Sequence, residues 1–133
     1  MFRGATLALW FLCAACSTGS TAVDITLEVR DGWIREPGVE CAGSRPFLYV
    51  HRNAPFRVED GSGEVLTSGV LPSGTGVEAL NEDLGVPKVP TFCRFRFSVE
   101  VPGPGRYRLV LEQGSPLELS VQGEVRDVTL VIS

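Results

Sequence analysis

The stretch Phe92–Glu112, FCRFRFSVEVPGPGRYRLVLE, decides the fold of this chain. In its first half, apolar residues take every second position and polar or charged residues take the positions between them: Cys93, Phe95, Phe97, Val99 and Val101. A period of two is typical of a β-strand with one buried face. After the break Pro102–Gly105, Tyr107, Leu109 and Leu111 repeat the pattern. The stretch therefore predicts two strands whose apolar faces must be covered by the rest of the chain.

The break between these two strands admits two geometries. A hairpin would pair Val101 with Tyr107 and would place Glu100 opposite Arg108. An arch would instead carry the chain from one sheet to a second sheet, and the Tyr107 hydroxyl would bond to loop backbone, as in a tyrosine corner. Two prolines and two glycines suit a wide corner better than a tight turn, so the arch is favoured and the hairpin is the alternative.

Further strands are predicted on both sides of this stretch. Alternation or apolar runs mark the following segments: 23–30, 47–50, 56–60, 64–71, 117–121 and 127–132. The pair 56–60 and 64–71 is predicted to form a hairpin, with Gly69 as a weak point or bulge. Thr75 and Glu78 have the spacing of a capping box, so a short helix is predicted over about 76–84. About seven strands and one brief helix predict an all-β, antiparallel β-sandwich over residues 23–133.

Composition bounds the class of protein. The chain has 133 residues, which suits one globular domain, and its net charge is -4. The bases are scattered, whereas phosphate binding needs a concentrated basic face, so no nucleic-acid partner is expected. His51 is the only histidine and has no Ser or Cys with an orienting acid beside it. No catalytic residue, metal site or cofactor is therefore predicted.

The first sixteen residues are predicted to be a targeting segment. Arg3 supplies a positive end, and the apolar run Ala5–Leu12 has the length of a signal peptide rather than of a membrane span. Residues 17–22 are then a flexible tether, and the chain is expected to be exported. Cleavage after Ala22 is one way in which a freely secreted form would arise.

The run Cys13-Ala14-Ala15-Cys16 resembles the lipobox of bacterial lipoproteins. The resemblance implies that Cys16 is lipidated and anchors the mature protein in the cell membrane, with simple secretion as the alternative. Cys13 then leaves with the signal, so Cys41 and Cys93 remain as one pair. Two such thiols in an oxidising compartment predict a disulfide.

Two further resemblances concern the domain. The run Pro102–Leu109, followed by the final Val-x-Leu-x-Ile strand, resembles the ending of prealbumin-like and carboxypeptidase regulatory-like domains. Cys41-x-Gly43, the pattern from Phe56 to Leu71 and the run Cys93–Pro102 are similar to small exported domains of unassigned function in high-GC bacteria. These resemblances imply an immunoglobulin-like or prealbumin-like sandwich that serves as an accessory or interaction module.

Two groups of residues are candidates for function. Four arginines on polar strand faces are either an ordinary solvated face, the favoured interpretation, or an interaction surface for an acidic partner or for anionic cell-wall or lipid groups: Arg94, Arg96, Arg106 and Arg108. The hairpin would neutralise two of them with Glu100 and Glu112, whereas the arch would place them on different sheets. Trp33 is either a core side chain, the favoured interpretation, or a ligand platform.

The resulting hypothesis is a non-enzymatic module of the cell envelope that binds protein or polymer through loops or an exposed sheet edge. The alternative is a small extracytoplasmic hydrolase or ligand carrier that uses surface carboxylates and Trp33.

Overall fold

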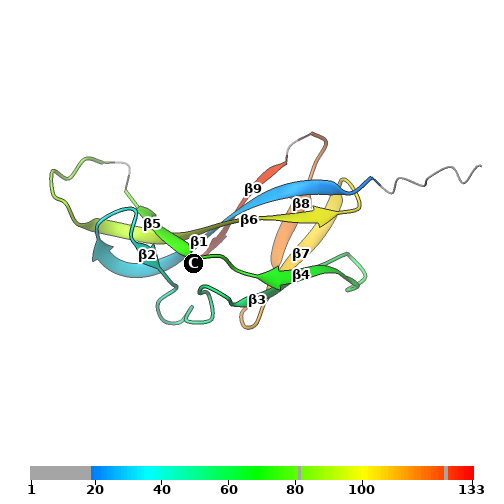
Figure 1. The fold of residues 1–133 in the computed structure, drawn as a ribbon, viewed down its shortest axis with the longest axis horizontal. Coiled ribbons are helices and arrows are strands. Elements are labelled where there is room, and N and C mark those ends of the chain that lie inside the picture. Colours follow the sequence, from blue (N-terminus) through cyan, green and yellow to red (C-terminus); the bar gives the residue numbers. More distant parts are fainter. Residues whose placement is uncertain (1–18, 81, 125) are drawn as a thin grey trace, which may run out of the picture.

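The computed structural model describes residues 19–80, 82–124 and 126–133 of the chain. Within these ranges lie nine strands: β1 (Thr21–Arg35), β2 (Glu40–Cys41), β3 (Pro55–Glu59), β4 (Val65–Val70), β5 (Gly74–Glu78), β6 (Val89–Val101), β7 (Gly105–Leu111), β8 (Leu117–Val121) and β9 (Asp127–Ile132). They form sheet A, in the order β2-β5-β6-β1-β9, and sheet B, in the order β4-β3-β7-β8. The two sheets pack as layers of a sandwich (Figure 1). The predicted all-β sandwich is confirmed, with nine strands in place of seven.

The strand pairs are antiparallel except for β1 and β9, which run parallel. Sheet A is built around the long β1–β6 pair, in which Val23 lies opposite Val99 and Leu27 lies opposite Phe95. Opposed residues share a face, so both apolar rows point toward sheet B. The inner rows are buried: Val23, Ile25, Leu27, Val29, Phe95, Val99 and Val101 from sheet A, and Phe56, Val58, Leu109, Leu119 and Val121 from sheet B. Full burial of one such side chain contributes about 1.5–3 kcal/mol.

The expected signal segment 1–16, with Cys13 and the lipid site Cys16, lies outside the described residues, as do positions 17 and 18 of the tether. β1 begins at Thr21, so Thr21 and Ala22, which are expected in the tether, pair instead with Val101 and Glu100. Within the described ranges, the chain forms no helix of the length and apolar character that a membrane span requires.

The connection between β6 and β7 is the predicted arch. β6 belongs to sheet A and β7 belongs to sheet B, so the chain changes layers between Val101 and Gly105. The Tyr107 hydroxyl donates a hydrogen bond to the Gly103 carbonyl oxygen at 2.6 Å, which ties the corner to the start of β7. The hairpin alternative is wrong, because Glu100 and Arg108 lie on different sheets.

The β3–β4 hairpin is confirmed, but its irregularity lies elsewhere than at Gly69. The register shifts where Val58 pairs with Thr67 and Glu59 pairs with Val65, so Leu66 is the extra residue. Asp60 closes the turn, since its Oδ1 accepts bonds from the Ser62 amide and hydroxyl and from the Glu64 amide. These hydrogen bonds lower the pKa of the Asp60 carboxyl, and the bond from the Ser62 hydroxyl has the largest effect.

The predicted helix over 76–84 is wrong, because Gly74–Glu78 forms β5 between β2 and β6. Thr75 lies opposite Arg94 on one side and Glu40 on the other. Gly76, the first residue of the predicted helix, is also a poor helix former. Pairing on both sides overrides the local capping pattern. The apolar run 47–50, predicted as a strand, forms turns instead.

Candidate functional site

The end of β1 carries the most unusual local structure of the described chain. Arg30 lies opposite Phe92 and Ile34 lies opposite Pro90, so the three residues 31–33 face Thr91 alone. We call residues 31–33 the β1 bulge. Such an insertion bends a strand and redirects its side chains. Asp31, in the bulge, and Thr91, opposite it on β6, are both buried.

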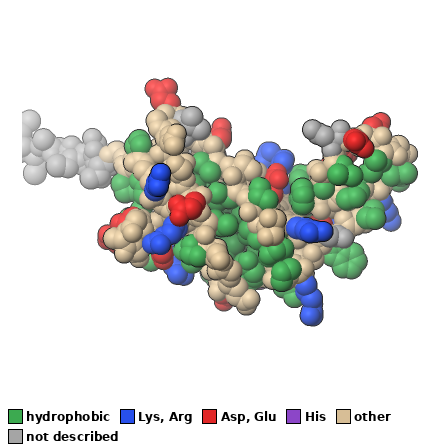
Figure 2. All heavy atoms as spheres, turned by 180° about the vertical axis from the view of Figure 1, so that it is seen from behind, with side chains coloured by type: hydrophobic (Ala, Val, Ile, Leu, Met, Phe, Trp, Pro, Cys, Tyr) green, Lys and Arg blue, Asp and Glu red, His purple; other side chains and the backbone are tan. Residues whose placement is uncertain are grey.

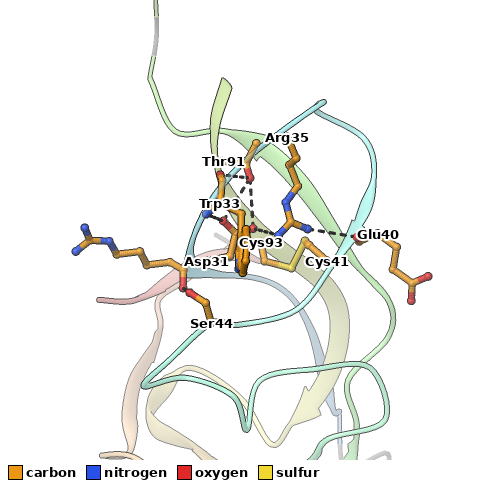
Figure 3. Close-up of a disulfide and its surroundings, with 9 residues drawn as sticks. Asp31, Trp33, Arg35, Glu40, Cys41, Ser44, Thr91 and Cys93 are labelled. Carbon is orange, nitrogen blue, oxygen red and sulfur yellow. Dashed lines mark hydrogen bonds and ion pairs between the residues drawn. A yellow bond between two sulfur atoms is a disulfide. The ribbon is translucent and has the colours of Figure 1, made fainter. Parts of the chain in front are cut away.

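The Asp31 carboxylate holds the bulge together, as Figure 3 shows. It accepts a hydrogen bond from the Trp33 amide at 3.0 Å and one from the Thr91 hydroxyl at 3.3 Å. Its Oδ2 lies 3.4 Å from Nη2 of Arg35, and the Asp31 side chain is completely buried. A buried carboxylate is tolerated when it is paired and hydrogen-bonded in this way. Asp31, Thr91 and Arg35 are therefore a positioning network for the end of β1.

The disulfide predicted from the cysteine count lies beside this network (Figure 3). Cys41 and Cys93 are bonded, with their Cα atoms 5.7 Å apart. Because β5 lies between β2 and β6, the bond crosses over β5, where Gly74 is opposite Cys41. A Cβ at Gly74 would lie 2.7 Å from Cζ of Phe95 and would also collide with the Cys93 sulfur. Glycine at position 74 thus leaves the space that the disulfide needs.

Trp33 points outward, so the prediction that it fills the core is wrong. Its side chain is 63% exposed, and that of Ile34 is 65% exposed. The inward position at this point of β1 belongs to Asp31, whose partners are Thr91 and Arg35. The bulge therefore turns an aromatic side chain toward solvent.

More apolar side chains are exposed at the same end of the molecule. The Ala79 amide donates to the carbonyl of Pro90 at 2.9 Å, and Pro90 is the residue opposite Ile34, so Ala79 lies near the end of β1. We define the distal apolar end by its exposed members: Trp33, Ile34, Val39, Leu80, Leu84 and Val86. Figure 2 shows hydrophobic side chains gathered there, on the right of the view. Exposed apolar side chains that gather at one end of a molecule are typical of interaction sites.

The four arginines of the possible interaction surface are divided between the layers. Arg94 and Arg96 lie on sheet A, and Arg106 and Arg108 lie on sheet B. Nη2 of Arg94 lies 2.6 Å from Oε1 of Glu28. Nη2 of Arg108 lies 3.9 Å from Oε1 of Glu59 and donates to the Asp60 carbonyl at 3.3 Å. The arch thus brings no four-arginine patch together.

Two hollows of the described surface lie away from Trp33. One of about 570 Å³ borders Leu66, Thr67, Val101 and Pro102. Another of about 500 Å³ lies on the outer face of sheet A, beside Asp24, Arg96 and Asp127. In the described part of the chain, no three His, Cys, Asp or Glu side chains are grouped so as to hold a metal ion.

Sequence reasoning missed the network of Asp31, Thr91 and Arg35. The sequence pattern could have indicated that Asp31 is buried. Asp31 lies two residues after Val29 and so continues the inward-facing row of β1 that contains Leu27 and Val29. A charged residue at a core-facing position calls for a partner, and Arg35 follows four residues later. No protein-family model, curated protein or solved structure matches this chain, so its functional interpretation depends on this geometry.

Proposed function

We propose that this protein is a non-enzymatic, exported module of the cell envelope, anchored through lipid on Cys16, which binds a partner protein through the distal apolar end. One observation carries the proposal: Trp33 and Ile34 are both more than 60% exposed at the end of a cross-linked scaffold. Tryptophan is enriched among the residues that dominate protein interfaces. The Asp31 network and the disulfide hold the scaffold beneath it.

The placement of the two ends supports this role. β1 extends from Thr21 to Arg35 with the bulge near its end, and 15 residues of strand span about 45 Å. The N-terminal end of the described chain and the distal apolar end therefore lie at opposite ends of the molecule (Figure 1). With lipid on Cys16, the module would present Trp33 away from the membrane surface.

The surroundings of Trp33 favour binding over hydrolysis or ligand transport. The carboxylate that bonds to its backbone is that of Asp31, whose side chain is buried and occupied by Thr91 and Arg35. A substrate in solvent would not reach this group. We also propose the finer class, a prealbumin-like or carboxypeptidase regulatory-like sandwich, supported by the Tyr107–Gly103 corner and the two-layer arrangement.

The anchor is tested by the intact mass of the protein from membrane and medium fractions. We expect a membrane-bound chain that begins at Cys16, carries lipid and has lost two hydrogens to the Cys41–Cys93 bond. Cys16→Ser should move the protein out of the membrane fraction, because one cysteine carries the lipid. An unmodified chain that begins at Val23 and accumulates in the medium would contradict the anchor.

The binding role is tested with a photoreactive residue at position 33, compared with one at Val131. Both native side chains are more than half exposed, but Val131 lies on β9, opposite Glu28, and does not belong to the distal apolar end. We expect position 33 alone to give a discrete covalent adduct in the producing cell. Wild-type protein should suppress the adduct, whereas protein with Trp33→Ser and Ile34→Ser should not.

The same double variant separates binding from folding. Because both side chains face solvent, its free energy of unfolding should change by less than about 0.5 kcal/mol. Equal adducts from positions 33 and 131, or suppression by both competitors alike, would refute a role for the distal apolar end.

A further inference from the structure

The free edge of sheet B at β4 differs from the other sheet edges of the described chain. Edge strands expose unpaired N–H and C=O groups, and proteins commonly protect them with charges or proline. β2 carries Glu40, β8 carries Glu118 and β9 carries Asp127. β4, with the sequence VLTSGV, carries neither a charge nor a proline, and its bulge at Leu66 leaves residues 67–70 regularly paired with β3. It also exposes two large apolar side chains, Val65 at 52% and Val70 at 57%.

The hydrogen bonds of Leu71, the residue after β4, show which N–H and C=O groups of β4 point to the free edge. The Leu71 amide donates to the Ala54 carbonyl and the Leu71 carbonyl accepts from the Asn53 amide, both at 2.9 Å. Leu71 thus directs both groups toward the β3 side. Backbone groups alternate along an antiparallel strand, so those of Val70 and Ser68 point to the free edge. Ser68 lies near the centre of the strand.

We infer that β4 pairs with β4 of a second copy of this chain, antiparallel about a two-fold axis at Ser68. Directly opposed residues must share a face, so partners differ by an even number of positions. Ser68 then lies opposite its own copy and Thr67 lies opposite Gly69, whereas Leu66 belongs to the bulge and takes no regular partner. The two four-stranded sheets become one sheet of eight strands. Such a contact is self-complementary, as two-fold interfaces must be.

Charge favours a second copy as the occupant of this edge. No like charges on β4 are opposed, whereas self-pairing of β8 or β9 would place two copies of Glu118 or Asp127 on one short ladder. The nearest charges on β3 neutralise each other, since Nε of Arg57 lies 2.8 Å from Oε2 of Glu59. Val70 of each copy, which is exposed on the same face as Ser68, would lie diagonal to Ser68 of the other copy.

The neighbouring surface leaves room for the partner strand. The hollow of about 570 Å³ adjoins β4 at Leu66 and Thr67, and its other side is Val101 and Pro102 at the arch. In the proposed register, Gly69 of the second copy lies opposite Thr67, at the mouth of this apolar hollow. The distal apolar end takes no part in the contact, so the inference stands independently of the proposed function.

Cysteine cross-linking of the full chain in the producing cell tests the pairing. Opposed residues of a hydrogen-bonded antiparallel pair have Cα atoms about 5.5 Å apart. That distance lies within the range of disulfides. Ser68→Cys should therefore convert most of the protein into a covalent dimer on a non-reducing gel. Ser120→Cys is the matched control, because Ser120 is also an exposed serine on an edge strand of sheet B.

A second variant covers the case in which the new thiol disturbs the edge. Val70→Lys should turn the native dimer, detected by a lysine-reactive cross-linker or by sedimentation in detergent, into a monomer that keeps its β-sheet circular dichroism. Equal dimer from Ser68→Cys and Ser120→Cys would overturn the inference. A wild-type chain that sediments as a monomer, or a Val70→Lys chain that stays dimeric, would overturn it as well.

Discussion

Loss of the Cys41–Cys93 disulfide is expected to lower the free energy of unfolding by about 4 kcal/mol, from the entropy of closing the loop in the unfolded chain. The cysteines are 52 residues apart in sequence, so the bond restricts a large part of the unfolded chain. In the folded state it fastens β2, a strand of two residues that pairs with β5 only through Glu40 and Cys41. A loss of this size is comparable to much of the net stability of a small domain.

Equilibrium unfolding in urea measures this effect in Cys41→Ala, in Cys93→Ala and in the double variant. Either single change removes the same bond, so all three variants should lose about the same free energy of unfolding. Reductant should destabilise the wild-type chain and leave the double variant unchanged. A loss below about 1 kcal/mol would show that the bond contributes little beyond local packing, and additive single losses would show that each side chain acts separately.

The parts of the fold that were predicted from sequence are those set by local alternation. The period of two in Phe92–Glu112 predicts β6 and β7 because each strand must bury one face, whatever its partner is. The arch could also be predicted from sequence, because Pro102–Gly105 are turn-forming residues and Tyr107 supplies the hydroxyl that bonds to the corner. The Cys41–Cys93 pair followed from counting the remaining thiols.

The failed helix shows where local patterns stop being sufficient. The spacing of Thr75 and Glu78 satisfies a rule about helix starts, and that rule concerns neighbours in sequence. Gly74 and Gly76 instead lie in a strand between Cys41 and Cys93, and both pairings join segments that are distant in sequence. Nothing in the segment itself states which strands will flank it.

Sequence reasoning missed the Asp31 network and misplaced Trp33 for a related reason. Average hydrophobicity places tryptophan inside and aspartate outside, and at the end of β1 this order is reversed. Asp31 is buried because Thr91, sixty residues later, and Arg35 supply its partners. Trp33 is exposed because the bulge that these bonds hold directs it to solvent. Sequence alternation shows Asp31 in a core-facing position, but it cannot supply the distant hydroxyl.

Asp31→Ala should cost about 3 kcal/mol of unfolding free energy, since removal of one partner of a buried ion pair leaves the other uncompensated. The estimate is at the low end of the usual range because the Arg35 side chain is 23% exposed and keeps some contact with water. The variant also deprives the Trp33 amide and the Thr91 hydroxyl of an acceptor. Urea unfolding gives the loss, and Glu82→Ala, at an exposed acid of the same end, is the control with no expected effect.

A second measurement, separate from unfolding free energy, tests whether Asp31 positions Trp33. Asp31→Asn keeps the shape and an oxygen that can accept from the Trp33 amide, but it removes the charge opposite Arg35. It should therefore lose less stability than Asp31→Ala and should retain slow hydrogen exchange at the Trp33 amide, whereas Asp31→Ala should exchange this amide quickly under native conditions. If both variants exchange it equally slowly, the bulge does not depend on the carboxylate. Because Trp33 is the only tryptophan after Trp10, iodide quenching in a Trp10→Phe background reports the same site independently.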